Sequence, residues 1–291
     1  MNTVARRYGC RKSLALLAAG FLMAPLAQAQ EALRSLGPVP DPAAAALAPR
    51  ALADLNRMIT QGDAYFDLGQ GVACKVDVAQ RQKEADKWAA AASGAVMTTI
   101  KEAAQSMISG ACPDGDGVFS GPVEYVEASL SRTEMSNIVM DTHTALRVQG
   151  VQVQGRAVGE STSFTRNRST TYHKLASGEL VAPQGAAAQD VSYFLTYATD
   201  DQSGKTIKPR VMFSFDAARK IVVVNVTESP DGVREVSTMY TDGKLFMRSR
   251  SKNGNYHGLT EYFDPTLVQI NKDKVCYQNG TEIKALQCPD T

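Results

Sequence analysis

The stretch Met239–Asp264 reads MYTDGKLFMRSRSKNGNYHGLTEYFD, and it predicts the fold of the C-terminal half. Short runs of alternating apolar and polar residues flank two dipeptides, Asp242-Gly243 and Asn253-Gly254. Asp-Gly and Asn-Gly accept the positive φ angles of a type I′ turn, which connects the strands of a tight β-hairpin. A third such dipeptide, Asn279-Gly280, follows downstream. The pattern predicts a β-meander, in which each strand pairs with the next.

The same alternation extends over most of residues 113–291. Val191, Tyr193, Leu195 and Tyr197, for example, alternate with polar neighbours. A period of two with one apolar face is typical of antiparallel strands that are half exposed to water. Short polar turns between the runs favour hairpins over helical crossovers. We expect an α+β, mostly β fold: one large antiparallel meander sheet, strongly curled or closed into a barrel, with a helical segment packed on it.

Residues 50–112 are expected to form the helical segment, after an Ala/Pro-rich leader at 30–49. A short helix is predicted at 47–59, with Leu52, Leu55 and Ile59 on one face. A longer helix is predicted at 79–109, where apolar residues recur at spacings of three and four. Its members are Ala85, Trp88, Ala92, Val96, Ile100, Ala103 and Met107.

The first 29 residues have the pattern of a secretory signal peptide. Arg6, Arg7, Arg11 and Lys12 form a basic region, and residues 13–26 form an apolar one. Ala27-Gln28-Ala29 is a small-x-small cleavage site. We expect export to a bacterial periplasm with cleavage after Ala29. An uncleaved signal anchor is the alternative.

Removing the signal peptide changes the charge. The whole chain has 31 Lys+Arg and 30 Asp+Glu residues, and four of the basic residues and none of the acidic ones lie in residues 1–29. The mature chain therefore has 27 basic and 30 acidic residues, a net charge of −3. Because nucleic-acid binding needs a concentrated basic surface, this balance argues against a nucleic-acid partner.

Four cysteines remain after cleavage: Cys74, Cys112, Cys276 and Cys288. An even number in an exported chain predicts two disulfides, with three pairings open. Cys276–Cys288 is favoured because the two residues bracket the last Asn-Gly turn, and Cys74–Cys112 follows by elimination. A bridge needs Cα atoms within about 7 Å, so the second pairing requires the helix at 79–109 to break into a hairpin near residues 93–94, or else the pairing is wrong.

Residues 239–281 resemble the MORN repeat in its bacterial, antitoxin-like variant. The resemblance rests on Tyr240-x-Asp242-Gly243-Lys244-Leu245, on residues 252–258 (KNGNYHG) and on residues 261–264 (EYFD). It implies hairpins used in protein scaffolding and sometimes in lipid contact, and it implies no catalysis. A likeness at the level of fold alone links the strand pattern to periplasmic lipoprotein carriers, which wrap an antiparallel sheet around a helix.

The residues offer no recognisable catalytic or metal site. Gly159-Glu160-Ser161 begins like a nucleophile elbow, but Ser163 stands where its second glycine belongs. His143 and His173 are the histidines that could accompany Ser161 in a triad, and nothing in the sequence brings them together. The three histidines are scattered and the cysteines are far apart, so we expect no metal and no cofactor.

One feature suggests a binding surface. Arg248, Arg250 and Lys252 stand two residues apart on a predicted strand, so they share one face and form a basic stripe. A solvated strand face that resists edge pairing explains such a stripe without a ligand. An anionic partner, either a lipid headgroup or an acidic protein surface, is the functional alternative.

Three functions fit these observations. The leading hypothesis is a non-catalytic periplasmic protein-interaction module, for instance an immunity or antitoxin-like protein that binds an envelope protein. The second is a periplasmic lipid or lipoprotein carrier. The third is a hydrolase with an unrecognised site. The carrier hypothesis requires a cavity, and a core filled throughout by side chains would contradict it.

Overall fold

The computed structural model describes residues 39–69, 72–74, 79, 82–83, 86, 96–107, 121–153, 156–182, 189–201, 206–218, 220–229, 231, 233–264, 273–284 and 288–289. The expected signal peptide and the first part of the leader lie outside this range. Within it, none of the helices has both the length and the hydropathy that crossing a membrane requires.

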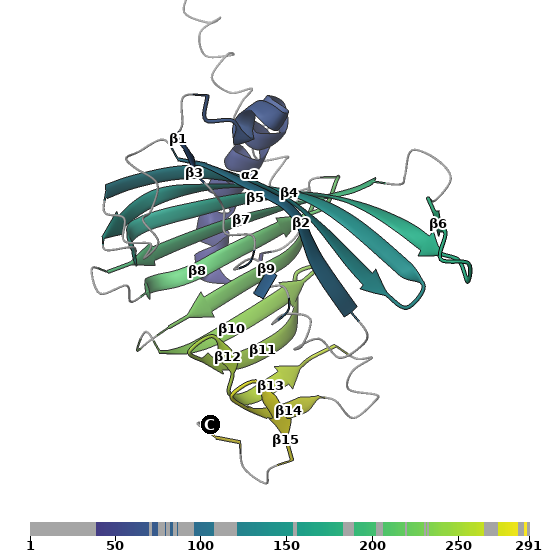
Figure 1. Ribbon diagram of the computed structural model, residues 1–291. Helices are drawn as coiled ribbons and strands as arrows, with labels where there is room; N and C mark the ends of the chain where they lie inside the picture. Colours follow the sequence, from purple (N-terminus) through teal and green to yellow (C-terminus); the bar gives the residue numbers. More distant parts are fainter. Residues whose placement is uncertain are drawn as a thin grey trace, which may run out of the picture.

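A single antiparallel sheet contains all the strands of the described part (Figure 1). Its first eight strands are β1 (Val72–Cys74), β2 (Val96–Met107), β3 (Gly121–Met135), β4 (Ile138–Val153), β5 (Arg156–Lys174), β6 (Leu180–Val181), β7 (Gln189–Asp200) and β8 (Thr206–Phe215). The others are β9 (Ile221–Glu228), β10 (Arg234–Thr241), β11 (Lys244–Lys252), β12 (Asn255–Tyr256), β13 (Gly258–Tyr262), β14 (Lys274–Gln278) and β15 (Thr281–Ile283). Apart from the short β6 and β12, which pair at the side, the strands follow one another in chain order, so the expected meander is confirmed.

The expectation of a strongly curled or barrel-like sheet is wrong. The sheet is open, and its path runs from β1 at one end to β15 at the other. Closing a barrel requires the two terminal strands to pair along their length. Here β5 has 19 residues, whereas β1 and β15 have 3 each. Figure 1 shows the sheet narrowing toward β13–β15, and the edge strands β1 and β15 are too short to pair along the length of the long central strands.

The hairpin turns have the predicted geometry. Asp242, Asn253 and Asn279 have φ angles of 48°, 52° and 51°, and the glycine after each is also positive, between 72° and 85°. Positive φ at both central residues defines the type I′ turn, whose twist matches that of the flanking strands. The turns join β10 to β11, β11 to β12 and β14 to β15, as the dipeptides indicated.

Helix α2 (Pro42–Gln61) is longer than the predicted 47–59 and begins inside the expected leader. The Asp41 carboxylate caps it by accepting hydrogen bonds from the Ala43 and Ala44 amides, at 2.8 and 3.1 Å. Pro42 follows at the first helical position, where its missing N–H costs nothing. The 3₁₀ helix η1 (Gly62–Phe66) continues from the end of α2.

The predicted helix at 79–109 is wrong over its second half. Residues 79, 82, 83 and 86 are helical, but residues 96–107 form β2. The register explains the misleading spacing. Val96, Ile100, Ala103 and Met107 all pair with odd-numbered residues of β3, on one face, and a bulge lies between Ile100 and Glu102. A period of two interrupted by one extra residue produces spacings of four, three and four, which imitate a helix.

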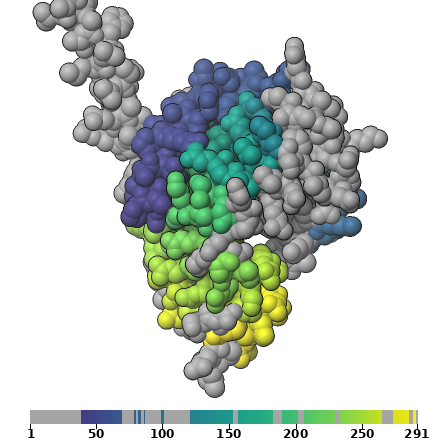
Figure 2. All heavy atoms as spheres, turned by 90° about the vertical axis from the view of Figure 1, so that its left-hand side faces the viewer, coloured from purple at the N-terminus to yellow at the C-terminus, as the bar shows by residue number. Residues whose placement is uncertain are grey.

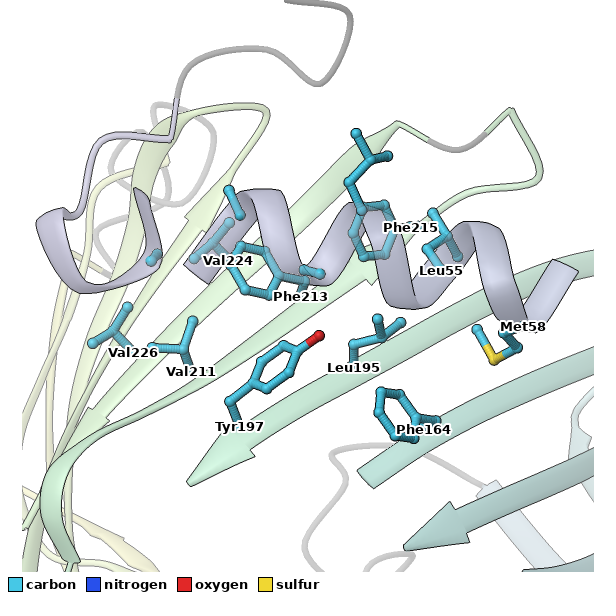
Figure 3. Close-up of a cluster of buried hydrophobic side chains, with 14 of the residues drawn as sticks. Leu55, Met58, Phe164, Leu195, Tyr197, Val211, Phe213, Phe215, Val224 and Val226 are labelled. Carbon is cyan, nitrogen blue, oxygen red and sulfur yellow. The ribbon is translucent and has the colours of Figure 1, made fainter. Parts of the chain in front are cut away.

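The main core lies between α2 and the middle of the sheet. Figure 3 shows Leu55 and Met58 of α2 in one cluster with Phe164, Leu195 and Phe215 of the sheet. Tyr197, Val211, Phe213, Val224 and Val226 complete the row of buried side chains on β7, β8 and β9. Ala44, Ala48 and Ala51 face them from the N-terminal half of α2 and are at most 4 % exposed. Small alanines let the helix backbone approach the aromatic side chains closely.

One expected disulfide is present. Cys276 and Cys288 are bonded, with their Cα atoms 5.3 Å apart. The chain end lies against β13, since a Cβ added to Gly258 would stand 3.0 Å from the Pro289 carbonyl oxygen. The disulfide holds the chain end in this position. Cys74 lies in β1, and Cys112 lies outside the described residues, so the second pairing stays a prediction.

Candidate functional site

A groove of about 290 Å³ lies between the N-terminal half of α2 and the sheet. Figure 2 shows the purple atoms of α2 directly beside the green atoms of the sheet. The helix side of the groove is formed by Ala43, Ala46, Leu47 and Arg50, which recur at spacings of three and four and so share one flank of α2. This flank is next to the buried alanine face, so the groove runs along the edge of the main core.

The sheet side of the groove is a row of cross-strand neighbours. Glu160 of β5 pairs with Thr199 of β7, which pairs with Lys208 of β8. Pro209 and Tyr197 also line the groove. The β7–β8 register shifts on both sides of Thr199, and such bulges change which side chains reach the surface. The groove therefore has an apolar helix wall and a floor with a charged residue at each end.

Tyr197 connects the groove to the core. Its hydroxyl donates a hydrogen bond to Asp54 Oδ2 on α2 at 2.9 Å, and the Arg50 guanidinium lies 4.9 Å from the centre of its ring. Burial is the main cause that raises the pKa of Tyr197, and the nearby Asp54 carboxylate adds to it. Arg50 also lies 3.6 Å from Glu160. These contacts fix the position of the α2 flank over the sheet.

The segment that follows α2 is joined to the sheet by charged side chains. Asp63 in η1 forms ion pairs with Arg166 and Arg168 of β5, at 2.5 and 3.4 Å. Arg147 of β4 donates to the Tyr65 carbonyl at 2.6 Å and forms an ion pair with Glu124. The N-terminal half of α2, beside the groove, contacts the sheet differently, through its alanine face and the ion pair of Arg50.

A second, smaller cleft of about 180 Å³ contains two residues of the predicted basic stripe. Arg250 and Lys252 line it, and the other lining residues are Arg234, Glu235, Val236, Ser251 and His257. Arg250 pairs with Val236 and Lys252 with Arg234, across β10 and β11. The third member of the stripe, Arg248, is exposed on the same strand and lies outside the cleft.

Register shows which face of the sheet carries the stripe. Val226 packs in the core beneath α2 and pairs with Thr238, which in turn pairs with Arg248. Directly paired residues lie on the same face of a sheet. Arg248, and with it Arg250 and Lys252 at two-residue steps, therefore lies on the face that α2 covers. The apolar core and the basic stripe are therefore neighbouring parts of the same face of the sheet.

The opposite face of the C-terminal hairpins carries a tyrosine cluster. Tyr256 and Tyr277 have ring centres 5.2 Å apart, and Tyr256 is 46 % exposed. Tyr262 pairs with Met247, the neighbour of Arg248, and so lies on the face away from α2. Burial is the main cause that raises the pKa of Tyr262 to about 12, and Tyr277 contributes through a hydrogen bond. The C-terminal hairpins thus have a basic face and an aromatic face.

The residues considered for a catalytic triad do not meet. Ser161 and His173 stand twelve residues apart on β5, about 40 Å at the rise of an extended strand. His143 pairs with Arg168, seven residues from Ser161, which corresponds to about 23 Å. A hydrogen bond between serine and histidine needs about 3 Å, so neither histidine activates Ser161.

The side chains that could bind a metal ion are also dispersed in the described part of the chain. Among the residues that the structure describes, no group of three or more His, Cys, Asp and Glu side chains is placed to hold a metal ion.

The groove residues on α2 were missed in the sequence because 30–49 resembled a flexible leader. The signal that could have found them is Asp41-Pro42 followed by four alanines, which is an N-cap and first-turn pattern. No such local signal exists for Glu160, Thr199 and Lys208. They come together only through pairing of three strands and two shifts of register.

Comparison with known proteins gives no relative: no family model, no curated protein and no solved structure matches this chain. The resemblance of residues 239–281 to MORN repeats therefore stays a prediction.

Proposed function

We propose that this protein is an exported, non-catalytic carrier that binds a small amphiphilic molecule in the groove between α2 and the sheet. The observation that supports it is the composition of the groove. Ala43, Ala46 and Leu47 supply an apolar wall, while Arg50 and Lys208 bring charges to its rim. Ligand sites are concave and mostly apolar, with a few polar groups that orient the ligand.

The volume limits the size of the ligand. At about 290 Å³ the groove is just below the roughly 300–1,000 Å³ found for small-molecule sites. The core directly beneath α2 is filled with side chains, among them Phe213, Leu195 and Leu55, each fully buried. This filled core contradicts a carrier with a cavity inside the sheet. The proposed ligand therefore lies beside the helix, and a single apolar chain fits better than a bulky multi-chain lipid.

The contacts of the N-terminal half of α2 favour a carrier. Its buried alanines present little side-chain area to the sheet, and its ion pair with the sheet is Arg50 to Glu160 at 3.6 Å. A ligand can widen the groove by moving this half, while the ion pairs of Asp63 keep the other end in place. Loading and release then need no unfolding of the sheet.

Native mass spectrometry of the protein, purified without detergent from the bacterial envelope, tests the proposal. The expected result is an added mass of lipid size that is lost on denaturation. A protein that stays bare after purification and also after incubation with single-chain amphiphiles contradicts the carrier function.

A protein-interaction module is the second candidate, and the tyrosine cluster favours it. Tyrosine is enriched at the centres of protein interfaces, and Tyr256 and Phe263 are exposed on the C-terminal hairpins, at 46 % and 42 %. Pull-down of an envelope protein by the wild type but not by a Tyr256→Ala variant supports this candidate. Capture that is equal for both variants argues against it.

A further inference from the structure

Building on the carrier function proposed above, we propose that the ligand is an anionic amphiphile. Its phosphate or carboxylate group binds Arg250 and Lys252 in the β10–β11 cleft, and its apolar chain follows the sheet into the α2 groove. The groove and the cleft are thus the two ends of one binding strip.

The strand register supports the continuity of this strip. Val211 and Val226 pair beneath α2, and two residues beyond them stand Pro209, in the groove floor, and Glu228. Glu228 pairs with Val236, and Val236 pairs with Arg250 in the cleft. The groove floor and the cleft therefore belong to one line across β8, β9, β10 and β11. Three strand spacings separate its ends, about 14 Å.

The cleft has the chemistry of an anion site. Arg234 and Lys252 pair across β10 and β11, and Arg250 stands beside Lys252 on the same face and pairs with Val236. Charge-assisted hydrogen bonds from guanidinium and ammonium groups are the strong contacts by which proteins hold phosphate and carboxylate. The apolar Val236 lies between Arg250 and Glu228 across the strands, so it separates the basic end of the strip from the groove end.

The acidic residues nearby determine which cations bind the anion. Glu235 lines the cleft itself and accepts a hydrogen bond from the Ser251 hydroxyl at 3.2 Å. Arg234 forms an ion pair with Asp231 at 2.6 Å, and Arg248 pairs across the strands with Glu261. Glu228 is exposed within the strip, so its charge repels an anion from the middle and favours the cleft end. Arg250 donates to the Leu259 carbonyl at 3.3 Å and keeps further N–H groups for a ligand.

Lys252 is the best residue for a test, because the bond from Arg250 to Leu259 also supports β13. Lys252→Glu reverses one charge in the cleft. Lys244→Glu makes the same change in net charge at the other end of β11, outside both the groove and the cleft. Calorimetric titration of both variants and the wild type uses three probes: dodecyl phosphate, dodecyl maltoside and inorganic phosphate. The two amphiphiles have the same chain, are used below their micelle concentrations, and differ in head charge.

The expected result is that the wild type binds dodecyl phosphate at least tenfold more tightly than dodecyl maltoside. Lys252→Glu should remove this preference and Lys244→Glu should retain it. Equal binding of both amphiphiles by all three proteins overturns the anionic site and leaves the carrier function standing. Inorganic phosphate bound as tightly as dodecyl phosphate overturns the strip, since the chain then contributes nothing. Failure to bind any amphiphile overturns the carrier function and this inference together.

Discussion

The Tyr197 hydroxyl donates to Asp54 Oδ2 over 2.9 Å, and this bond joins α2 to the floor of the groove. The Asp54 side chain is only 13 % exposed and also pairs with Arg57 at 2.7 Å. The bond thus belongs to a partly buried network that determines how the helix lies on the sheet.

Tyr197→Phe removes the bond and little else. A hydrogen bond to a charged group contributes about 1.5–3 kcal/mol, so we expect the free energy of unfolding in urea to fall by that amount. A double-mutant cycle with Asp54→Ala tests the pairing, because residues in one network show a coupling of at least about 0.5 kcal/mol. Strictly additive losses would show that the two side chains do not act together.

Asp63 makes the free energy of unfolding depend on pH in the acidic range. The hydrogen bond and charge of Arg166, with the charge of Arg168, hold the pKa of Asp63 below its ordinary value of 3.8. A lowered folded-state pKa stabilises the fold above the ordinary value, and this stabilisation is lost as the pH falls through and below it. Asp63→Asn should therefore flatten the loss of stability below about pH 4, measured by urea unfolding across pH.

Asp67→Asn, which changes an exposed carboxylate in the same segment, is the matched control for Asp63→Asn. Asp63→Asn should also loosen the attachment of η1 to β5. An acid profile identical to that of the wild type contradicts the assigned role of the ion pairs.

Tyr262 makes the free energy of unfolding depend on pH in the alkaline range. Its folded-state pKa is raised from 10.0 to about 12, mainly by burial. The folded protein holds this proton more tightly than the unfolded chain, so the stabilisation is complete below pH 10 and is lost as the pH rises toward 12. Titration of tyrosinate absorbance should show a phenol that titrates near pH 12 in the wild type and is missing in Tyr262→Phe, whereas Tyr197, whose pKa burial also raises, titrates late in both proteins. An unchanged titration curve in that variant contradicts the assignment.

Gly254→Ala isolates the cost of a type I′ turn. Gly254 has a φ of 74°, and an added Cβ would meet no atom within 4 Å. The expected loss of about 1–2 kcal/mol is therefore conformational, because left-handed backbone is unfavourable for residues with a Cβ. Gly254→Asn should lose less, since asparagine tolerates this conformation better. Equal unfolding midpoints for Gly254→Ala and the wild type would mean that the turn can adopt another type.

The hairpins could be predicted because their signal is local. Asp242-Gly243, Asn253-Gly254 and Asn279-Gly280 each specify a turn within two residues. Openness of the sheet could not be predicted, since it depends on how long the terminal strands are and where they end. The strand β2 was mistaken for helix because a single bulge between Ile100 and Glu102 changed the spacing of its apolar residues.

The candidate site was predicted only in its basic part. Arg248, Arg250 and Lys252 share a face because strand periodicity requires it, and the register confirms that they do. That this face is also the one beneath α2 depends on pairing from β8 through β11 and on the docking of a distant helix. The groove residues Ala46 and Lys208 are 162 positions apart in the chain, and no local pattern connects them.

The most direct test of the carrier function is a substitution that fills the groove with a larger side chain. Ala46 lines it, whereas the adjacent Ala45 is equally exposed on α2 and does not. Ala46→Phe places a phenyl ring in the groove, and Ala45→Phe places the same ring outside it. Calorimetric titration with dodecyl phosphate should show binding at least tenfold weaker in Ala46→Phe and unchanged in Ala45→Phe, with the same circular dichroism for both. Equal affinities in the two variants would contradict binding beside α2.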